Sequence, residues 1–237
     1  MEKPHSNTII ANSLPFEEIY NCLINLIETN IEDFPAFFKD AENDYKLSPA
    51  LIKKENIIQE DDTTVPFGRF FNFLENTGFY FENQYKTPET NATTDIGIIA
   101  KRYSKNRVIC FVEAKRLPTP PSTKREQTEY VFYKNPIKQG GIERFKTEKH
   151  AGKEQLHFSI MLGYIREQTP QHWYTQVNKW IESQISISSN PEINWTNKDK
   201  LEHDTDFKKN KISKFTSEHS RKTLKDLKLI HYWIDFT

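Results

Sequence analysis

The sequence is poor in cysteine, methionine and glycine. Its 237 residues include two cysteines, two methionines and seven glycines. Cys22 and Cys110 cannot form a disulfide framework, so we expect both to be reduced residues of the core. The sequence also lacks zinc-ligand spacing, a phosphate-binding P-loop, a G-x-S-x-G elbow, a Cys/His nucleophile pair and internal repeats. These absences exclude disulfide-rich secreted domains, P-loop NTPases, zinc fingers and repeat proteins.

Long hydrophobic runs are missing as well. No stretch is long enough to span a bilayer, and residues 1–5 lack the basic start and apolar run of a secretory signal. Charged residues make up 28%, hydrophobic residues 36% and aromatic residues 13% of the chain, which is typical of a soluble globular protein. We therefore expect a cytoplasmic protein that does not bind membranes.

The net charge is zero, but the charge is unevenly distributed. Residues 1–62 contain 13 acidic and 5 basic residues, whereas the remainder contains 20 acidic and 28 basic residues. A basic remainder is compatible with binding to a phosphate backbone. The alternative is a solvated polar surface without a partner, and the modest excess of charge leaves it open.

The hydrophobic pattern predicts an α/β protein. Apolar residues recur at helical spacing in residues 14–29, 60–76 and 170–185. Strand-like runs are found at residues 79–85, 94–100, 107–115, 156–165 and 227–236. We predict a central mixed β-sheet flanked by helices over residues 56–237, with an N-terminal helical extension over residues 1–55. Residues 186–206, which are rich in Ser, Asn and Asp, are expected to form a solvated loop.

Two of the predicted strands carry charged side chains in a buried context. Residues 107–115 read RVICFVEAK, an apolar run that ends in Glu113, Ala114 and Lys115. Side chains alternate along a strand, so Glu113 and Lys115 share one face. Asp95 lies near the start of the preceding strand, and the polar turn at residues 104–106 can bring it to the same end of the sheet. We therefore expect two carboxylates and one amine to face one small volume.

This combination suits metal-assisted hydrolysis of phosphodiesters. Magnesium prefers hard oxygen ligands and is often held by one or two carboxylates together with substrate phosphate. Bound metal can generate a nucleophile from water and offset charge on phosphorus. Lys115 could stabilise developing negative charge or orient the attacking water.

Asp95, followed after seventeen residues by Glu113-Ala114-Lys115, resembles the catalytic signature of the PD-(D/E)XK nucleases, the restriction-endonuclease-like superfamily. The resemblance covers residues 58–165 at the level of motifs, and Thr94 replaces the proline of the signature. It implies a restriction-endonuclease-like core, with Mg²⁺ or Mn²⁺ held by Asp95 and Glu113 and with Lys115 as a catalytic residue. Three other acid-x-Lys triplets occur in the chain, but none follows a buried-strand pattern. The alternative is an ion pair at a strand end.

The first helix of that superfamily often supplies a further acidic metal ligand. Glu60 begins the predicted helix 60–76, Glu75 lies near its end, and Glu82 lies on the first strand. We favour Glu60 as the third metal ligand. The competing interpretation is that Glu60 only complements the helix dipole.

Basic residues downstream of the Glu113 strand are candidates for substrate binding. Gly140 and Gly141 are expected to open a basic helix that runs to His150 and carries Arg144 and Lys146. His219 and Arg221, at strand spacing, could share a face and contact phosphate. The alternative for residues 207–228 is an exposed basic edge strand.

The first functional hypothesis is therefore a magnesium-dependent endonuclease acting on DNA in restriction, phage defence or DNA repair. Enzymes of this kind often act as homodimers to cut both strands, but no segment identifies an interface. The second hypothesis is a non-catalytic nucleic-acid-binding or scaffolding module built on the same core. A third is hydrolysis of a different phosphoester, such as RNA, and the sequence leaves this open because no feature in it reads a 2′-hydroxyl.

Overall fold

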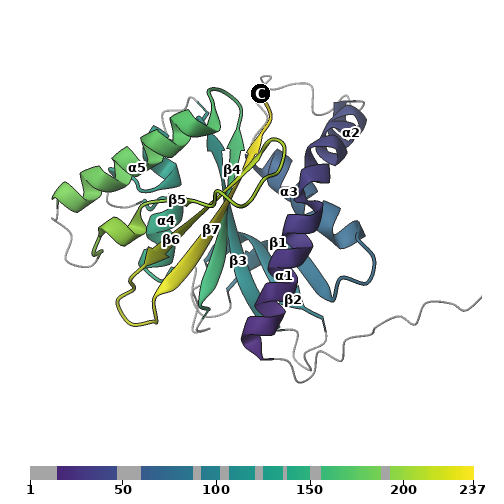
Figure 1. The fold of residues 1–237 in the computed structure, drawn as a ribbon, viewed down its shortest axis with the longest axis horizontal. Coiled ribbons are helices and arrows are strands. Elements are labelled where there is room, and N and C mark those ends of the chain that lie inside the picture. The colour runs from purple at the N-terminus through teal and green to yellow at the C-terminus, as the bar shows by residue number, and fades with distance from the viewer. Residues whose placement is uncertain are drawn as a thin grey trace, which may run out of the picture.

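The computed structural model describes residues 15–46, 60–87, 92–101, 107–120, 125–135, 138–149, 156–187 and 193–237. Within these ranges the chain forms a seven-stranded mixed sheet with helices on both faces. Figure 1 shows α4 and α5 on one side of the central strands and α1, α2 and α3 on the other. The predicted α/β architecture, a mixed sheet flanked by helices, is confirmed.

The helices are α1 (Phe16–Asn30), α2 (Phe34–Lys46), α3 (Glu60–Phe73), α4 (Gly141–Lys146) and α5 (Pro170–Ile187). Short 3₁₀ turns are η2 (Ile31–Asp33), η3 (Gln127–Tyr130) and η4 (Asn197–Asp199). The strands are β1 (Phe79–Lys86), β2 (Thr93–Ala100), β3 (Arg107–Leu117), β4 (Phe158–Ile165), β5 (Glu202–His203), β6 (Ile212–His219) and β7 (Leu227–Asp235).

The strand order is β1-β2-β3-β4-β7-β6-β5. β1, β2 and β3 form an antiparallel meander, β4 pairs in parallel with both β3 and β7, and β6 and β5 continue antiparallel from β7. Strands β3, β4 and β7 are thus central and parallel, and helices cover both of their faces. This explains why their sequences are continuous apolar runs rather than alternating ones.

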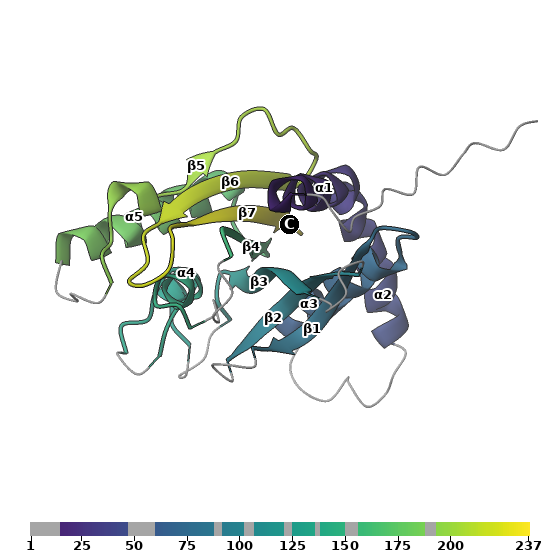
Figure 2. The same cartoon turned by 90° about the horizontal axis from the view of Figure 1, so that it is seen from below.

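Each face of the sheet has its own hydrophobic cluster. On the first face, α1, α2 and α3 pack on residues such as Val112, Ile160 and Ile230. On the second face, η3, α4 and α5 pack on Phe111, Met161 and other side chains. Glu113 and Lys115 alternate with Val112 and Ala114 along β3 and therefore belong to the second face. Figure 2 shows α4 beside β3 and β4.

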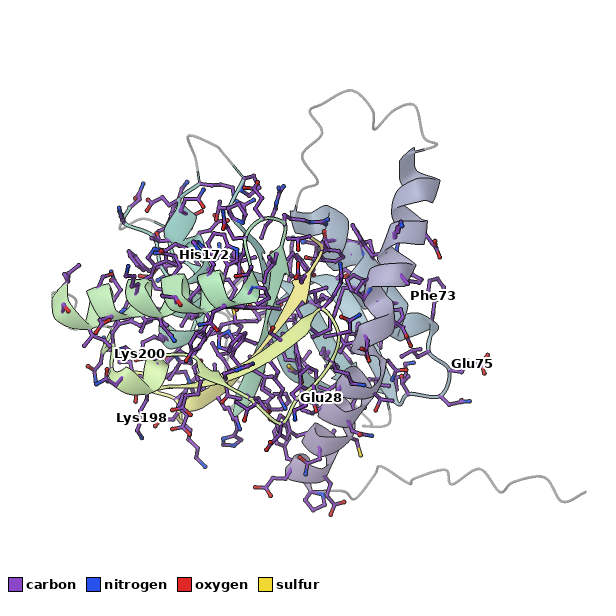
Figure 3. All side chains as sticks on the ribbon, turned by 45° about the horizontal axis from the view of Figure 1, so that its top comes forward. Glu28, Phe73, Glu75, His172, Lys198 and Lys200 are labelled. Carbon is purple, nitrogen blue, oxygen red and sulfur yellow. The ribbon has the colours of Figure 1, made fainter. Side chains whose placement is uncertain are left out.

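The N-terminal helices share the core of the sheet. Ile19, Leu23 and Ile27 of α1 are buried in the first cluster. Glu28, labelled in Figure 3, accepts a hydrogen bond from the Tyr232 hydroxyl at 2.9 Å and forms an ion pair with Lys214 at 2.6 Å. These contacts fasten α1 to β6 and β7. The boundary at residue 55 stays a prediction.

Several local predictions were wrong. Cys22 is exposed on α1 rather than buried, because the apolar stripe of that helix runs through Ile19, Leu23 and Ile27. α4 ends at Lys146, and Glu148 has a positive φ of 62°, so the helix does not reach His150. Strand β6 lies between β5 and β7, so it is not an edge strand.

The segment predicted as a solvated loop is partly structured. It contains η4 and β5, and Asp199 within it is fully buried. None of the described helices is both long and apolar enough to cross a membrane.

Candidate active site

Asp95 and Glu113 lie side by side on neighbouring strands. Ile96 of β2 pairs with Val112 of β3 in antiparallel register, so Asp95 stands opposite Glu113. The backbone N–H of Ala114 donates a hydrogen bond of 2.7 Å to Asp95 Oδ2. This contact fixes the Asp95 carboxylate against the end of β3.

Glu113 is held by two cations through one oxygen. Lys115 Nζ lies 2.7 Å and Arg144 Nη1 lies 2.8 Å from Glu113 Oε1. Lys115 also donates to the Ala114 carbonyl at 2.6 Å. Glu113 is 0% exposed, whereas the Arg144 side chain is 32% exposed. A carboxylate buried this deeply requires such partners, because an unpaired charge in the interior is strongly unfavourable.

The two adjacent glycines bring Arg144 to Glu113. A Cβ atom on Gly141 would lie 2.6 Å from Met161 Cε, and one on Gly140 would lie 2.4 Å from the Phe132 nitrogen. Met161 is the register partner of Glu113 on β4. Gly141 therefore allows close packing of α4 on β4, and Gly140 allows close packing against the backbone of Phe132.

Segment 125–133 adds charged and polar groups beside the site. Arg125 forms an ion pair with Glu129, and the Tyr133 hydroxyl donates to Glu129 Oε2 at 2.6 Å. Burial raises the pKa of Tyr130 and Tyr133, and the positive charge of Lys115 acts in the opposite direction on both phenols. Both phenols therefore lie close enough to Lys115 for its charge to influence their pKa.

Of the other predicted site residues, those that the structure describes do not join this cluster. Glu60 begins α3, but its side chain lies outside the described part of the structure, as does His150. Lys146 and His219 are buried and both bond to Asp199, so they are not placed to contact a substrate at the surface. Arg221 lies beyond the end of β6 and donates to the carbonyls of Lys225 and Leu156. Of the five predicted substrate contacts, Arg144 is the one that the described structure brings to Glu113.

A second group of polar residues is buried behind the site. Its members are joined by side-chain hydrogen bonds, and we call them the buried polar chain: Lys146, Asp199, His219, Ser217, His231, Tyr130 and Trp233. Asp199, Ser217, His231, Tyr130 and Trp233 are not among the site residues predicted from the sequence. No local signal could have identified them, because the group is assembled from α4, η4, β6, β7 and η3.

Part of this chain has the connectivity of a serine hydrolase triad. Asp199 Oδ1 lies 2.5 Å from His219 Nδ1, and His219 Nε2 lies 2.7 Å from Ser217 Oγ. However, Ser217 is 3% exposed and its hydroxyl also contacts His231 Nε2 at 2.7 Å. A nucleophile needs access to its substrate, which Ser217 lacks, so this arrangement does not support hydrolysis at Ser217.

The donor set at Asp95 and Glu113 suits a hard cation that retains water. Among the described residues, no group of three or more His, Cys, Asp or Glu side chains could hold a metal ion. Two adjacent carboxylates nevertheless match the limited protein ligation of Mg²⁺, whose remaining positions are filled by water and substrate phosphate. They do not match the nitrogen and sulfur ligands typical of a zinc site.

Comparison of the chain with protein-family models, with curated proteins and with solved structures gave no match in any of the three.

Proposed function

We propose that the protein is a metal-dependent nuclease that hydrolyses phosphodiester bonds in DNA. The observation that carries the proposal is the meeting of Asp95, Glu113, Lys115 and Arg144 at the junction of β2, β3 and α4. The order α3, β1, β2, β3 is also that expected at the start of a PD-(D/E)XK nuclease core, which supports the resemblance in sequence. An endonuclease in restriction, phage defence or DNA repair is the wider role that this resemblance suggests.

Asp95 and Glu113 would hold Mg²⁺, or Mn²⁺ in its place. The bound metal would supply an activated water and offset negative charge on the phosphate. Asp95 is already oriented by the Ala114 N–H, and Glu113 lies beside it in the ladder. The side chain of Glu60 lies outside the described structure, so its role as a third ligand stays a prediction.

Lys115 and Arg144 have a second role in this proposal. Both donate to Glu113 Oε1, the oxygen at which they would compete with a metal ion. When Glu113 becomes a metal ligand, these two cations would turn from it to the anionic phosphate and stabilise charge that develops there. Arg144 is partly exposed and is therefore the side chain better placed to reach substrate.

Cleavage of plasmid DNA in Mg²⁺ tests the proposal. We expect Asp95→Ala and Lys115→Ala each to lower the rate at least about a hundredfold, because the first removes a metal ligand and the second removes a positive charge at the reacting phosphate. The chain offers a matched control in Asp206-Phe207-Lys208, an exposed acid-x-Lys triplet, so Asp206→Ala and Lys208→Ala should cleave like wild type. Equal cleavage by Asp95→Ala and wild type would disprove a nuclease centred on Asp95.

Parallel assays on RNA and DNA of the same sequence identify the polymer. DNA is the substrate that we propose, and preferential cleavage of RNA would redirect the proposal to a ribonuclease at the same site.

A further inference from the structure

The hydrogen bonds of the buried polar chain can be assigned a direction from one end. Lys146 Nζ and His219 Nδ1 both lie 2.5 Å from Asp199 Oδ1. Burial raises the pKa of Asp199, but the hydrogen bonds and charges of His219 and Lys146 overcome this effect and lower it. Asp199 is therefore an anion that only accepts hydrogen bonds, so His219 Nδ1 must carry a hydrogen.

The histidines transmit this direction along the chain. Burial lowers the pKa of His219 and of His231, so both are neutral at neutral pH. His219 Nε2 is then an acceptor, to which the Ser217 hydroxyl donates its hydrogen over 2.7 Å. The Ser217 oxygen is left to accept from His231 Nε2, also at 2.7 Å, which makes His231 Nδ1 an acceptor.

The far end of the chain is fixed in the same way. The Tyr130 hydroxyl donates to His231 Nδ1 at 2.9 Å, and Trp233 Nε1 donates to the Tyr130 oxygen at 2.8 Å. Every hydrogen from Trp233 to His219 thus points along the chain toward Asp199. With Asp199 charged and both imidazoles neutral, a single arrangement of hydrogens gives every contact of the buried polar chain one donor and one acceptor.

Lys146 at one end of the buried polar chain and Tyr130 near its other end lie on elements that pack beside the candidate active site. Lys146 belongs to α4, two residues from Arg144, whereas Tyr130 belongs to η3. Trp233 is in register with Gly163, which is in register with Lys115. A Cβ atom on Gly163 would lie 2.3 Å from Trp233 Cδ1, so the indole packs directly over this glycine next to Lys115.

We propose that Lys146, acting through Asp199, sets the direction of the buried polar chain and that the chain positions η3 and α4 over the candidate site. His219, Ser217 and His231 are then positioning residues that keep Arg144 and Tyr130 in place without contacting substrate. This role in positioning rests on the proposed function, whereas the direction of the hydrogen bonds does not.

Lys146 decides the direction because it is the cation that compensates the Asp199 anion. Without its charge, the buried Asp199 anion must be compensated by His219, which would become doubly protonated. His219 Nε2 would then donate to Ser217, Ser217 would donate to His231 Nε2, and His231 would carry its hydrogen on Nδ1. The charge of Arg221 also opposes protonation of His219, and the charge of a protonated His219 lowers the pKa of His231.

Two-bond ¹H–¹⁵N NMR correlation of the imidazole rings at pH 7.5 tests the direction directly. In the wild type we expect neutral His219 protonated on Nδ1 and neutral His231 protonated on Nε2. Lys146→Met should give a doubly protonated His219 and move the hydrogen of His231 to Nδ1, whereas Lys146→Arg should keep the wild-type pattern. A wild-type His231 protonated on Nδ1, or tautomers unchanged in a folded Lys146→Met protein, would overturn the assignment. If Lys146→Met does not fold, the wild-type spectrum still decides the direction of the hydrogen bonds in the buried polar chain.

Binding of fluorescent duplex DNA in EDTA tests the positioning role. Ser217→Ala interrupts the chain at its centre, and we expect it to raise Kd at least about threefold, in the same direction as Arg144→Gln. Ser159→Ala is the matched control, because Ser159 is also buried on this face and shares the register partner Leu229 with Ser217. Wild-type affinity in Ser217→Ala overturns the positioning role. If the wild type does not bind DNA, the proposed function fails, while the tautomers still decide the direction of the chain.

Discussion

Arg144 of α4 donates to Glu113 of β3 across 2.8 Å, although 31 residues separate them in the sequence. The same Glu113 oxygen also accepts from Lys115. A carboxylate proposed as a metal ligand is therefore paired with two protein cations. This arrangement predicts that metal and DNA assist each other in binding.

We expect Arg144→Gln to bind Mn²⁺ more tightly than the wild type in the absence of DNA, since one competitor for Glu113 is removed. The same substitution should weaken binding of DNA about tenfold, because a charge-assisted contact to phosphate is lost. Calorimetric titration of Mn²⁺ and anisotropy with labelled duplex measure the two effects. Arg69→Gln, on the exposed surface of α3, should change neither. Weaker binding of Mn²⁺ by Arg144→Gln would contradict the competition at Glu113.

Metal titration also separates the nuclease from the scaffold hypothesis. Asp95→Asn keeps the shape of the side chain and its capacity to accept the Ala114 N–H, but it removes a charged metal ligand. We expect it to abolish measurable binding of Mn²⁺ in a protein that remains folded by circular dichroism. DNA binding that is sensitive to salt, together with no binding of Mn²⁺ by the wild type, would instead favour the non-catalytic module.

The ion pairs of Glu113 have a measurable effect on stability. Glu113→Ala removes the carboxylate that lies 2.7 Å from the ammonium group of the nearly buried Lys115, and we expect it to lower the free energy of unfolding by about 3–5 kcal/mol. Glu113→Gln retains an oxygen acceptor and should cost less. Urea denaturation followed by tryptophan fluorescence gives both values. A loss below about 1 kcal/mol in Glu113→Ala would show that these pairs behave as exposed ones.

The buried histidines predict a loss of stability in mild acid. Burial lowers the pKa of His219 and of His231 below the unfolded value of 6.5, so the unfolded chain binds more protons just below pH 6.5. Stability is therefore present above this pH and falls as the pH decreases, by up to about 1.4 kcal/mol per pH unit for each histidine. Urea midpoints between pH 5 and 8 measure the slope. His231→Asn should flatten it, because it removes one of the two buried imidazoles.

Gly163 provides a test of the packing beside Lys115. In Gly163→Ala the new methyl group would meet Trp233, and we expect a loss of about 1–3 kcal/mol from overpacking. Thermal unfolding measures the loss, and near-ultraviolet circular dichroism reports any displacement of the indole. A stability equal to that of the wild type would show that Trp233 can move away at no cost.

Much of the fold could be predicted from local patterns. The stripe of Ile19, Leu23 and Ile27 predicted α1, and the apolar run of 107–115 predicted a central strand buried on both faces. Alternation along that strand also predicted that Glu113 and Lys115 share a face. These predictions succeeded because they depend on periods of two and 3.6 residues, which the sequence displays directly.

Predictions that required distant partners were less accurate. Lys146 and His219 look like exposed basic residues in the sequence, yet both are buried because Asp199 compensates them. Asp199 itself lies in a segment whose composition is typical of a solvated loop. A charged residue is buried only where tertiary structure supplies its partner, and residues 146, 199 and 219 are too far apart in sequence for a local pattern to indicate this.

The sequence by itself determined β1, β2, β3, β4 and β7, their buried faces and the pairing of acidic and basic groups at Glu113 and Lys115, since alternation and hydrophobicity are local properties. The tertiary structure alone decided that Asp95 stands opposite Glu113, that Arg144 joins them, and that a chain of buried polar groups lies behind the site. The physical reason is that strand register and the packing of α4 depend on which apolar surfaces are buried against one another in the folded core. That choice is made by the whole core, so no single segment encodes it.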